Sequence, residues 1–209
     1  MNSKVTHINV GNLAENCWFL ANEDTKEAVV IDPGAEPDRI CATAEKHGWK
    51  ITAILLTHGH IDHMGACESL RTELGVKVYA LTEEEDLLLD AKKNLSVFIE
   101  RKVVTFEPDE LLRDGQELTL AGMKIQVIHT PGHTPGGCSY YVADAGCVFS
   151  GDTLFAESVG RSEFRGGSTS ALVRAVKEKL FLLPDDTLVC PGHGEETTIG
   201  HEKKYNSFV

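Results

Sequence analysis

Residues 51–63 read ITAILLTHGHIDH and carry the strongest structural signal in the chain. The first half, Ile51 to Leu56, is an apolar run typical of a buried strand, which delivers the residues after it to the edge of a sheet. Three histidines and one aspartate then follow within six residues: His58, His60, Asp62 and His63. Neighbours on one helical face are three or four residues apart. The spacing therefore favours a loop whose first two histidines point at one centre and whose last two polar residues point at another.

Imidazole and carboxylate groups are the usual protein ligands of transition metals such as zinc and iron. A solvated polar loop after a strand is the alternative, and a single histidine would favour it. The density of this cluster predicts a metal site instead.

Three more polar residues occupy tight turns, each directly after a predicted strand. His133 lies in TPGHTPG (130–136), Asp152 in SGDT (150–153) and His193 in PGHG (191–194). Proline and glycine fix sharp backbone turns, which hold one side chain at a defined angle. Four strand ends that each present histidine or aspartate predict a shared metal centre. The remaining histidines are interpreted as surface or core residues: His7, His47, His129 and His201.

Short strands and helices alternate along the rest of the chain. Strands are predicted where β-branched and aromatic runs are bounded by Gly, Asp or Asn: 5–10, 17–20, 28–31, 51–56, 76–80, 117–120, 124–129, 138–142, 147–149 and 187–190. Helices are predicted at 37–47, 66–74, 170–183 and 202–209, with a capping box at 82–85 and a hairpin turn at 121–122. This interleaving indicates an α/β or α+β layered fold.

The composition limits the possible partners. The chain has 209 residues, is 42% hydrophobic and carries a formal net charge of −12. Such acidity argues against sequence-independent binding to nucleic acid and against binding to an anionic membrane, because both kinds of binding need clustered Lys and Arg. The apolar runs are far shorter than the roughly 20 residues of a membrane span.

The cysteines and the N-terminus predict a cytoplasmic location. Six cysteines are scattered without a Cys-x-x-Cys pair and are interpreted as buried thiols in a reducing compartment. The first seven residues lack the apolar segment of a signal peptide.

The order of motifs, His-x-His-x-Asp-His followed by His, Asp and His, resembles the metallo-β-lactamase superfamily of binuclear metallohydrolases. The resemblance extends from Asp32-Pro33-Gly34 to the turn at 191–194. Within that superfamily the chain is most similar to glyoxalase II-type proteins, the hydroxyacylglutathione hydrolases, in residues 57–65, 151–155 and 191–198. The resemblance implies a four-layer αββα sandwich of α+β class. It also implies one domain over residues 1–209, lacking most of the C-terminal helical segment of typical glyoxalase II.

The resemblance further implies a ligand set for two divalent transition metals, with zinc first and iron or manganese as alternatives. The first metal would take His58, His60 and His133, the second would take Asp62, His63 and His193, and Asp152 would bridge them. Asp32, at the end of a strand, would support the metal loops by hydrogen bonding rather than bind a metal.

The activity implied is hydrolysis of a thioester such as S-hydroxyacylglutathione or a related thiol conjugate. Metals lower the pKa of bound water to about 7, so a bridging hydroxide would attack the acyl carbon. Asp62 would orient this hydroxide and is the expected catalytic residue. With both metals bound, the site keeps a formal charge of about +1, which attracts a small anionic substrate to an otherwise acidic protein.

Arg161 lies in GRSEF (160–164), where the family places a basic substrate-binding residue. A surface ion pair with Glu157 or Glu163 is an equally open interpretation of Arg161. The expected partner is a small anionic thioester, with no nucleic acid and no membrane, and the oligomeric state is left open.

A mononuclear-iron persulfide dioxygenase on the same scaffold is the main alternative. His58, His133 and Asp152 would supply its two-histidine, one-carboxylate iron site. The turn around His193 favours two metals and therefore the hydrolase. The missing export signal disfavours a β-lactamase, and the small acidic chain disfavours RNA processing. A non-enzymatic metal-binding protein would be supported by a lost ligand, and none is lost.

Overall fold

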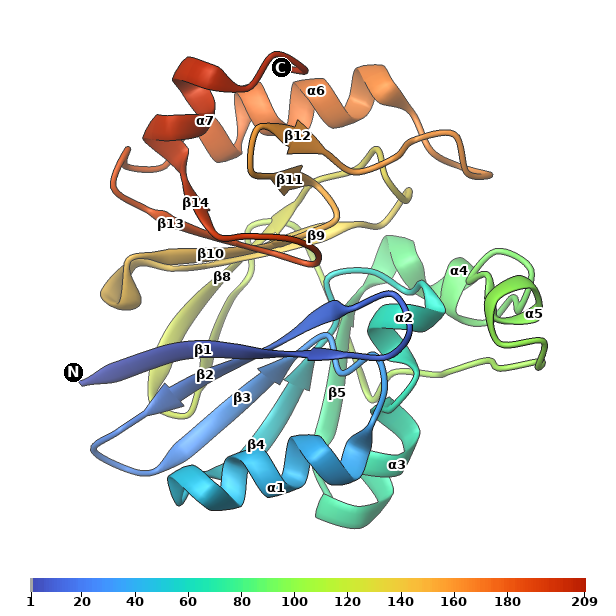
Figure 1. The fold of residues 1–209 in the computed structure, drawn as a ribbon, viewed down its shortest axis with the longest axis vertical. Helices are drawn as coiled ribbons and strands as arrows, with labels where there is room; N and C mark the ends of the chain where they lie inside the picture. The colour runs from blue at the N-terminus through green and yellow to red at the C-terminus, as the bar shows by residue number, and fades with distance from the viewer. Residues whose placement is uncertain (1) are drawn as a thin grey trace.

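The computed structural model describes residues 2–209; Met1 lies outside them. Two six-stranded sheets pack face to face, and helices cover the outer face of each sheet (Figure 1). The four-layer αββα arrangement expected from the sequence is therefore confirmed. Within residues 2–209, no helix is both long enough and apolar enough to cross a membrane.

The first sheet contains the N-terminal half of the chain. Its strands are, in spatial order, β1 (Ser3–Val10), β2 (Glu15–Asn22), β3 (Glu27–Ile31), β4 (Lys50–Leu55), β5 (Lys77–Leu81) and β6 (Glu110–Leu112). β1 to β3 are antiparallel, whereas β3 to β6 run parallel. Parallel neighbours need crossover connections, and helices α1 (Pro37–His47) and α3 (Cys67–Leu74) supply two of them. α1 begins with Pro37 in its first turn and ends at His47, followed by a capping Gly48 with a left-handed φ of 70°.

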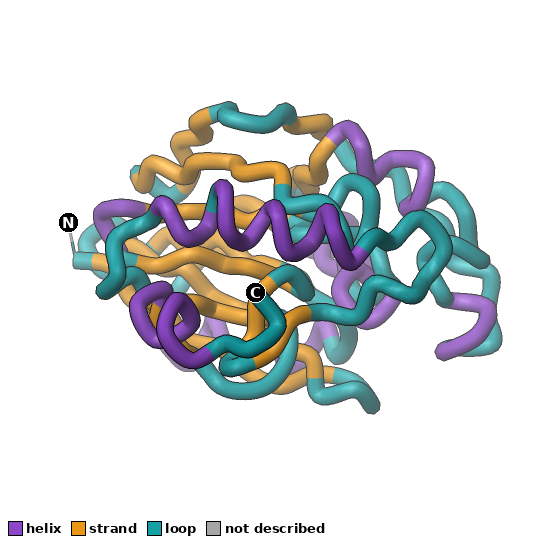
Figure 2. Tube along the Cα trace, turned by 90° about the horizontal axis from the view of Figure 1, so that it is seen from above, coloured by secondary structure: helices purple, strands orange, loops and turns teal. Residues whose placement is uncertain are grey.

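The second sheet contains the C-terminal half. Its spatial order is β14 (Thr197–Thr198), β13 (Leu188–Pro191), β10 (Cys147–Gly151), β9 (Cys138–Val142), β8 (Met123–His129) and β7 (Glu117–Leu120). Only the β10–β13 pair is parallel. Ala121 and Gly122 form the β7–β8 turn with positive φ at both residues, as a type I′ hairpin requires. Helices α6 (Thr169–Glu178) and α7 (Ile199–Tyr205) cover this sheet, and the view from above shows α6 lying across its strands (Figure 2).

Three apolar clusters fill the three interfaces between the four layers. Successive side chains of a strand point to opposite faces, so neighbouring residues enter different clusters. In β4, Ile54 packs toward α1 and α3, whereas Leu55 packs between the sheets. Trp18 lies between the sheets and Phe19 packs toward the helices in the same way. The third cluster joins the second sheet to α6 and α7. Strands buried on both faces explain the continuous apolar runs seen in the sequence.

The structure departs from several sequence predictions. The helix predicted at 170–183 ends at Glu178 and is followed by a 3-10 turn at 180–182. The terminal helix begins at Ile199, where Thr198 caps it, rather than at 202. The capping box at 82–85 is wrong, because no side chain caps this turn and Thr82 donates to the Leu112 carbonyl instead. The helix start expected there is nevertheless present, as a 3-10 turn followed by α4 (Glu85–Leu88). Short elements escaped prediction: β6, β14, the ribbon of β11 (Leu154–Phe155) and β12 (Ser158–Val159), α2 (Ile61–Met64) and α5 (Ser96–Ile99).

Tyr140 ties the two sheets together beside the polar segment. It is buried in β9 of the second sheet, and its hydroxyl donates to the Leu56 carbonyl at 2.6 Å, just past the end of β4. The bond fixes the point from which residues 57–63 leave the first sheet.

Removing this hydroxyl should therefore cost stability. We expect Tyr140→Phe to lower the free energy of unfolding by about 1–2 kcal/mol, because the buried Leu56 carbonyl loses its best donor. The neighbouring Tyr141 is half-buried, and its hydroxyl has no hydrogen-bond partner within residues 2–209, so Tyr141→Phe is a matched control that should change little. Urea denaturation of both variants checks this, and equal losses would contradict the role given to Tyr140.

Candidate metal centre

All seven predicted ligands meet at one edge of the sandwich. Four strands end there: β4 and β8, which lie in different sheets, and the parallel pair β10 and β13. The turns that follow these strands carry His58, His60, Asp62, His63, His133, Asp152 and His193. Asp62 and His63 belong to the one-turn helix α2 rather than to a loop.

Three buried histidines form what we call the first group: His58, His60 and His133. Their ligand atoms lie within 4.8 Å of one another. His60 Nδ1 and His133 Nε2 are 2.9 Å apart. The other ring nitrogen of His133, Nδ1, lies 2.6 Å from the Arg161 carbonyl oxygen, which fixes it as a donor and leaves Nε2 facing the centre.

The second group consists of Asp62, His63 and His193, whose ligand atoms also lie within 4.8 Å of one another. His193 Nε2 is 3.3 Å from Asp62 Oδ2, and His63 Nε2 is 3.9 Å from the same oxygen. The two groups thus surround neighbouring but separate centres.

Asp152 lies between the two groups. Its Oδ2 is 3.4 Å from His133 Nε2, while its Oδ1 is 3.4 Å from His63 Nε2 and 3.9 Å from His193 Nε2. One oxygen therefore faces each group, which is the placement a bridging carboxylate needs. Gly192 makes room for this, since a Cβ at that position would lie 2.4 Å from Asp152 Oδ1.

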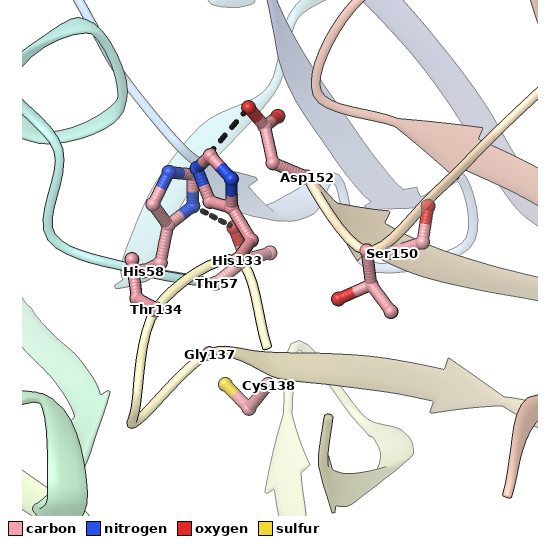
Figure 3. A pocket seen from close by; sticks show the side chains of 9 residues that line it. Thr57, His58, His133, Thr134, Gly137, Cys138, Ser150 and Asp152 are labelled. Carbon is pink, nitrogen blue, oxygen red and sulfur yellow. Dashed lines mark hydrogen bonds and ion pairs between the residues drawn. The ribbon is translucent and has the colours of Figure 1, made fainter. Parts of the chain in front are cut away.

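The donor atoms themselves fit metal ions. His58 Nε2, His63 Nε2 and Asp152 Oδ1 are buried and have no hydrogen-bond partner within residues 2–209. An unpaired buried polar atom is costly, and coordination to a cation is the ordinary way to satisfy several in one place. Figure 3 shows His58 and His133 close to Asp152 in this region. Imidazole with carboxylate suits zinc, iron and manganese, the metals expected from the sequence.

Electrostatics distinguish the two groups. Burial lowers the pKa of His58 well below its usual range and that of His60 to about 3, so both rings are neutral, the form that binds metals. Burial acts on His63 in the same direction, but the carboxylates of Asp152 and Asp62 outweigh it and raise the pKa of His63 well above its usual range. Burial likewise opposes ionisation of Asp152, yet His63 holds the pKa of Asp152 below its usual value. The carboxylates thus draw positive charge to the second group.

Asp32 lies behind the groups as a support. Its carboxylate accepts the Thr57 backbone N–H at 2.7 Å, the Thr57 hydroxyl at 2.5 Å and, at 3.0 Å, a bond from His63 Nδ1. Asp32, His58 and His63 also lie close enough to form a third possible metal-ligand set. The bonds to Thr57 and His63 occupy both Asp32 oxygens, which favours the supporting role expected from the sequence.

Glu84 links two of the turns at the site, and the sequence did not single it out. It is buried, and its two oxygens accept the backbone N–H of Gly59 at 2.9 Å and of Gly136 at 2.8 Å. Gly59 separates His58 from His60, and Gly136 ends the His133 turn. Burial raises the pKa of Glu84 to about 7. The sequence showed only a run of glutamates, 83–85, typical of a helix start, and nothing in it indicated that Glu84 is the buried one.

Glu15 was missed as well. It is fully buried at the start of β2, neither carboxylate oxygen has a partner within residues 2–209, and Oε1 lies 3.8 Å from His63 Nδ1. Burial raises the pKa of Glu15 well above its usual value. The sequence signal that could have identified Glu15 is its position just before the apolar run 17–21, CWFLA, where a carboxylate is drawn into a buried strand.

Arg161 is exposed, and its guanidinium lies 4.8 Å from the centre of the Phe164 ring. Within residues 2–209 it pairs with neither Glu157 nor Glu163; Glu157 instead contacts His201 at 3.0 Å. The ion-pair interpretation of Arg161 therefore finds no support in the fold.

The two hydrogen bonds that Glu84 accepts from Gly59 and Gly136 lead to a prediction. Glu84→Gln keeps the size of the side chain but turns its NH₂ group toward one of the two backbone N–H donors. We expect metal affinity at the first group to fall about 10- to 100-fold, with the second group less affected. Cobalt titration followed by absorption checks this, and Glu83→Gln, at the exposed neighbouring position, is the matched control. Unchanged affinity in Glu84→Gln would show that the two turns hold their shape without this carboxylate.

Comparisons with known proteins agree on the family. The model of the metallo-beta-lactamase superfamily matches residues 10–193. A probable metallo-hydrolase of Bacillus subtilis, YqgX, is 39% identical over 96% of this chain and 94% of that protein. The hydroxyacylglutathione hydrolase GloC of Haemophilus influenzae is 35% identical over 93% of this chain and 92% of its own length.

Solved structures extend the comparison. The B3 metallo-beta-lactamase BLEG-1 superposes with a TM-score of 0.93 at 38% identity, covering 98% of this chain and 99% of that one. TTHA1623, solved in a di-iron-bound form, superposes with a TM-score of 0.86 at 36% identity, covering 98% of this chain and 100% of that one. ETHE1 from Myxococcus xanthus superposes with a TM-score of 0.78 at 30% identity, covering 99% of this chain and 84% of that one. With the family model spanning most of the chain and these relatives covering nearly all of it, the protein belongs to the metallo-beta-lactamase superfamily.

Proposed function

We propose that the protein is a two-metal hydrolase of thioesters, such as S-hydroxyacylglutathione or a related thiol conjugate. The observation that carries this proposal is the pair of separate histidine and aspartate groups with Asp152 between them. The relative named as a hydroxyacylglutathione hydrolase supports the substrate class, and the di-iron-bound neighbour supports two metals. Zinc is the metal we expect first, with iron or manganese as alternatives.

In this proposal the first group would hold one metal and the second group the other, and Asp152, which lies between them, would supply one oxygen to each. Divalent metals at such sites lower the pKa of bound water and polarise a carbonyl oxygen.

The chain's own residues then position the reactants. Asp62 lies beside the cavity with Oδ2 directed at His193 and His63, so its other oxygen is available to accept a proton from the attacking water and to orient it. Attack forms a C–O bond at the acyl carbon, and the C–S bond breaks. An ordinary thiol has a pKa of about 8.5, so the thiolate leaves without a dedicated general acid. The departing thiolate takes up a proton from solvent, while Asp62 and the newly formed carboxylic acid release theirs, so the products are a carboxylate, a thiol and one proton.

The test combines metal analysis with hydrolysis. We expect about two transition metals per chain, loss of thioester hydrolysis on chelation, and near-complete loss of turnover in His60→Ala. Asp152→Asn removes the charge between two cations and should lower both metal content and kcat severely. His201→Ala, at a histidine outside both groups, is the control and should keep metal and activity. Two metals and normal kcat in Asp152→Asn would contradict the bridging role.

A persulfide dioxygenase is the second candidate, supported by the likeness to ETHE1. Such an enzyme would use one iron held by two histidines and one carboxylate. One iron per chain, with oxygen uptake on glutathione persulfide and no thioester hydrolysis, would replace the hydrolase proposal. A chromogenic β-lactam belongs in the same panel, because BLEG-1 is named a β-lactamase.

We propose further that Arg161 binds a carboxylate of the substrate. It is charged, exposed and lines the cavity beside both groups, and a guanidinium binds carboxylates through two parallel hydrogen bonds.

Arg161→Ala should therefore raise KM for an anionic thioester while kcat changes little, because the contact lies away from the bond that breaks. The loss in kcat/KM should be roughly 10- to 100-fold, equivalent to about 1.5–3 kcal/mol. A thioester without carboxylates is the control substrate and should be unaffected. Equal losses on both substrates would assign Arg161 a structural role.

A further inference from the structure

A cavity of about 290 Å³ opens beside the two groups. Ligands from both groups form part of its lining, and the rest is mostly apolar: Leu13, Leu95, Ile99, Phe155 and Phe164. Among the described lining residues outside the ligands, Arg161 is the one charged side chain. Metal chemistry alone requires no such apolar wall.

The apolar residues come from separate parts of the chain. Leu13 lies in the β1–β2 turn, Ile99 in α5, Phe155 in β11 and Phe164 in the segment before α6. Leu13 and Ile99 are 48% and 39% exposed. Single exposed apolar residues are ordinary, but a contiguous group around one cavity marks a binding surface.

This apolar wall reaches both groups of ligands. The Phe164 ring centre lies 5.4 Å from that of His60 and 5.8 Å from that of His133. Phe155 lies edge-on to His193 at 6.3 Å. A molecule reacting beside the two groups therefore meets apolar surface immediately outside them.

The backbone at Leu95 is also unusual, because this residue has a left-handed φ of 67°, which leucine rarely adopts. The preceding Asn94 holds the segment in place. Its carbonyl accepts the Ile61 N–H at 2.9 Å, and its side chain donates to the Val104 carbonyl at 2.8 Å. Strained residues persist where the surroundings fix them, and they gather at ligand sites.

The size and charge of the cavity narrow the choice of occupant. Small-molecule pockets span about 300–1,000 Å³, so this one is at the small end. Glutathione has two carboxylates and one ammonium group, whereas the lining offers one guanidinium and no lysine. The lining is better matched to one negative charge and an apolar chain.

We infer that the site selects a small thioester with a single negative charge and an apolar acyl chain, which packs against the wall formed by Leu13, Leu95, Ile99, Phe155 and Phe164. The inference that the ligand is a thioester rests on the proposed hydrolase function. The inferred preference for an apolar chain rests on the cavity, and a binding measurement can test it without any catalysis.

The first experiment measures binding of straight-chain carboxylates, from acetate to hexanoate, to the metal-loaded protein by calorimetry. Affinity should rise about two- to fourfold per added methylene. Ile99→Asn and Leu13→Asn, at partly exposed positions on different sides of the cavity, should each reduce this rise. Val103→Asn is the matched control, since Val103 follows α5, is 81% exposed and lies outside the lining. Equal affinity along the series, or the same reduction in Val103→Asn, would overturn the inference.

The second experiment varies the acyl group of thioesters that share one small thiol carrying a carboxylate. Here kcat/KM should rise by a similar factor per methylene from acetyl to hexanoyl. For the same acyl group, the glutathione thioester should have a kcat/KM no higher than that of the thioester of the small thiol. Hydrolysis without chain-length dependence would overturn the inference and leave the hydrolase proposal intact. A chain-length dependence in carboxylate binding with no hydrolysis of any thioester would overturn the hydrolase proposal and leave the apolar selectivity standing.

Discussion

The placement of the Asp152 carboxylate between two sets of imidazoles is the constraint on which the rest of the site depends. One oxygen faces His133 and the other faces His63, each at 3.4 Å. Just before Asp152, the register of β10 against β13 shifts between Phe149 and Gly151, which leaves Ser150 as the extra residue. A side chain at Gly192 would collide with the same carboxylate. The bulge and the glycine are local irregularities of the sheet that serve the site.

The ligand turns are held from behind by buried carboxylates. Asp32 anchors Thr57 and His63, and Glu84 joins the turn of His58 and His60 to that of His133. These turns belong to different sheets, so Glu84 fixes the relative position of the two halves of the sandwich at the site. Rotamers and turns locked in this way keep donor atoms in place before any ligand arrives.

The layered fold and the location of the site could be predicted because their signals are local. Apolar runs marked the main strands, and Gly or Pro marked the turns that follow them, as with Gly48 after α1 and Ala121-Gly122 between β7 and β8. Two-residue strands such as β14 carry no periodicity and could not be found. Glu84 and Glu15 could not be assigned either, because their roles depend on backbone N–H groups and a histidine from other parts of the chain. A sequence pattern reveals what a residue can donate or accept, whereas burial decides whether it does.

The buried polar atoms also connect the site to the stability of the fold. His58 Nε2 and His63 Nε2 are buried without partners among residues 2–209, and each such atom costs about 1–3 kcal/mol when left unpaired. The unfolded chain hydrates these atoms, so the cost falls on the folded state alone. A metal that binds the folded state removes the cost and adds its own binding free energy to folding. The site edge of the sandwich is thus less stable by itself than its apolar layers, and the turns at this edge rely on the buried hydrogen bonds of Asp32 and Glu84.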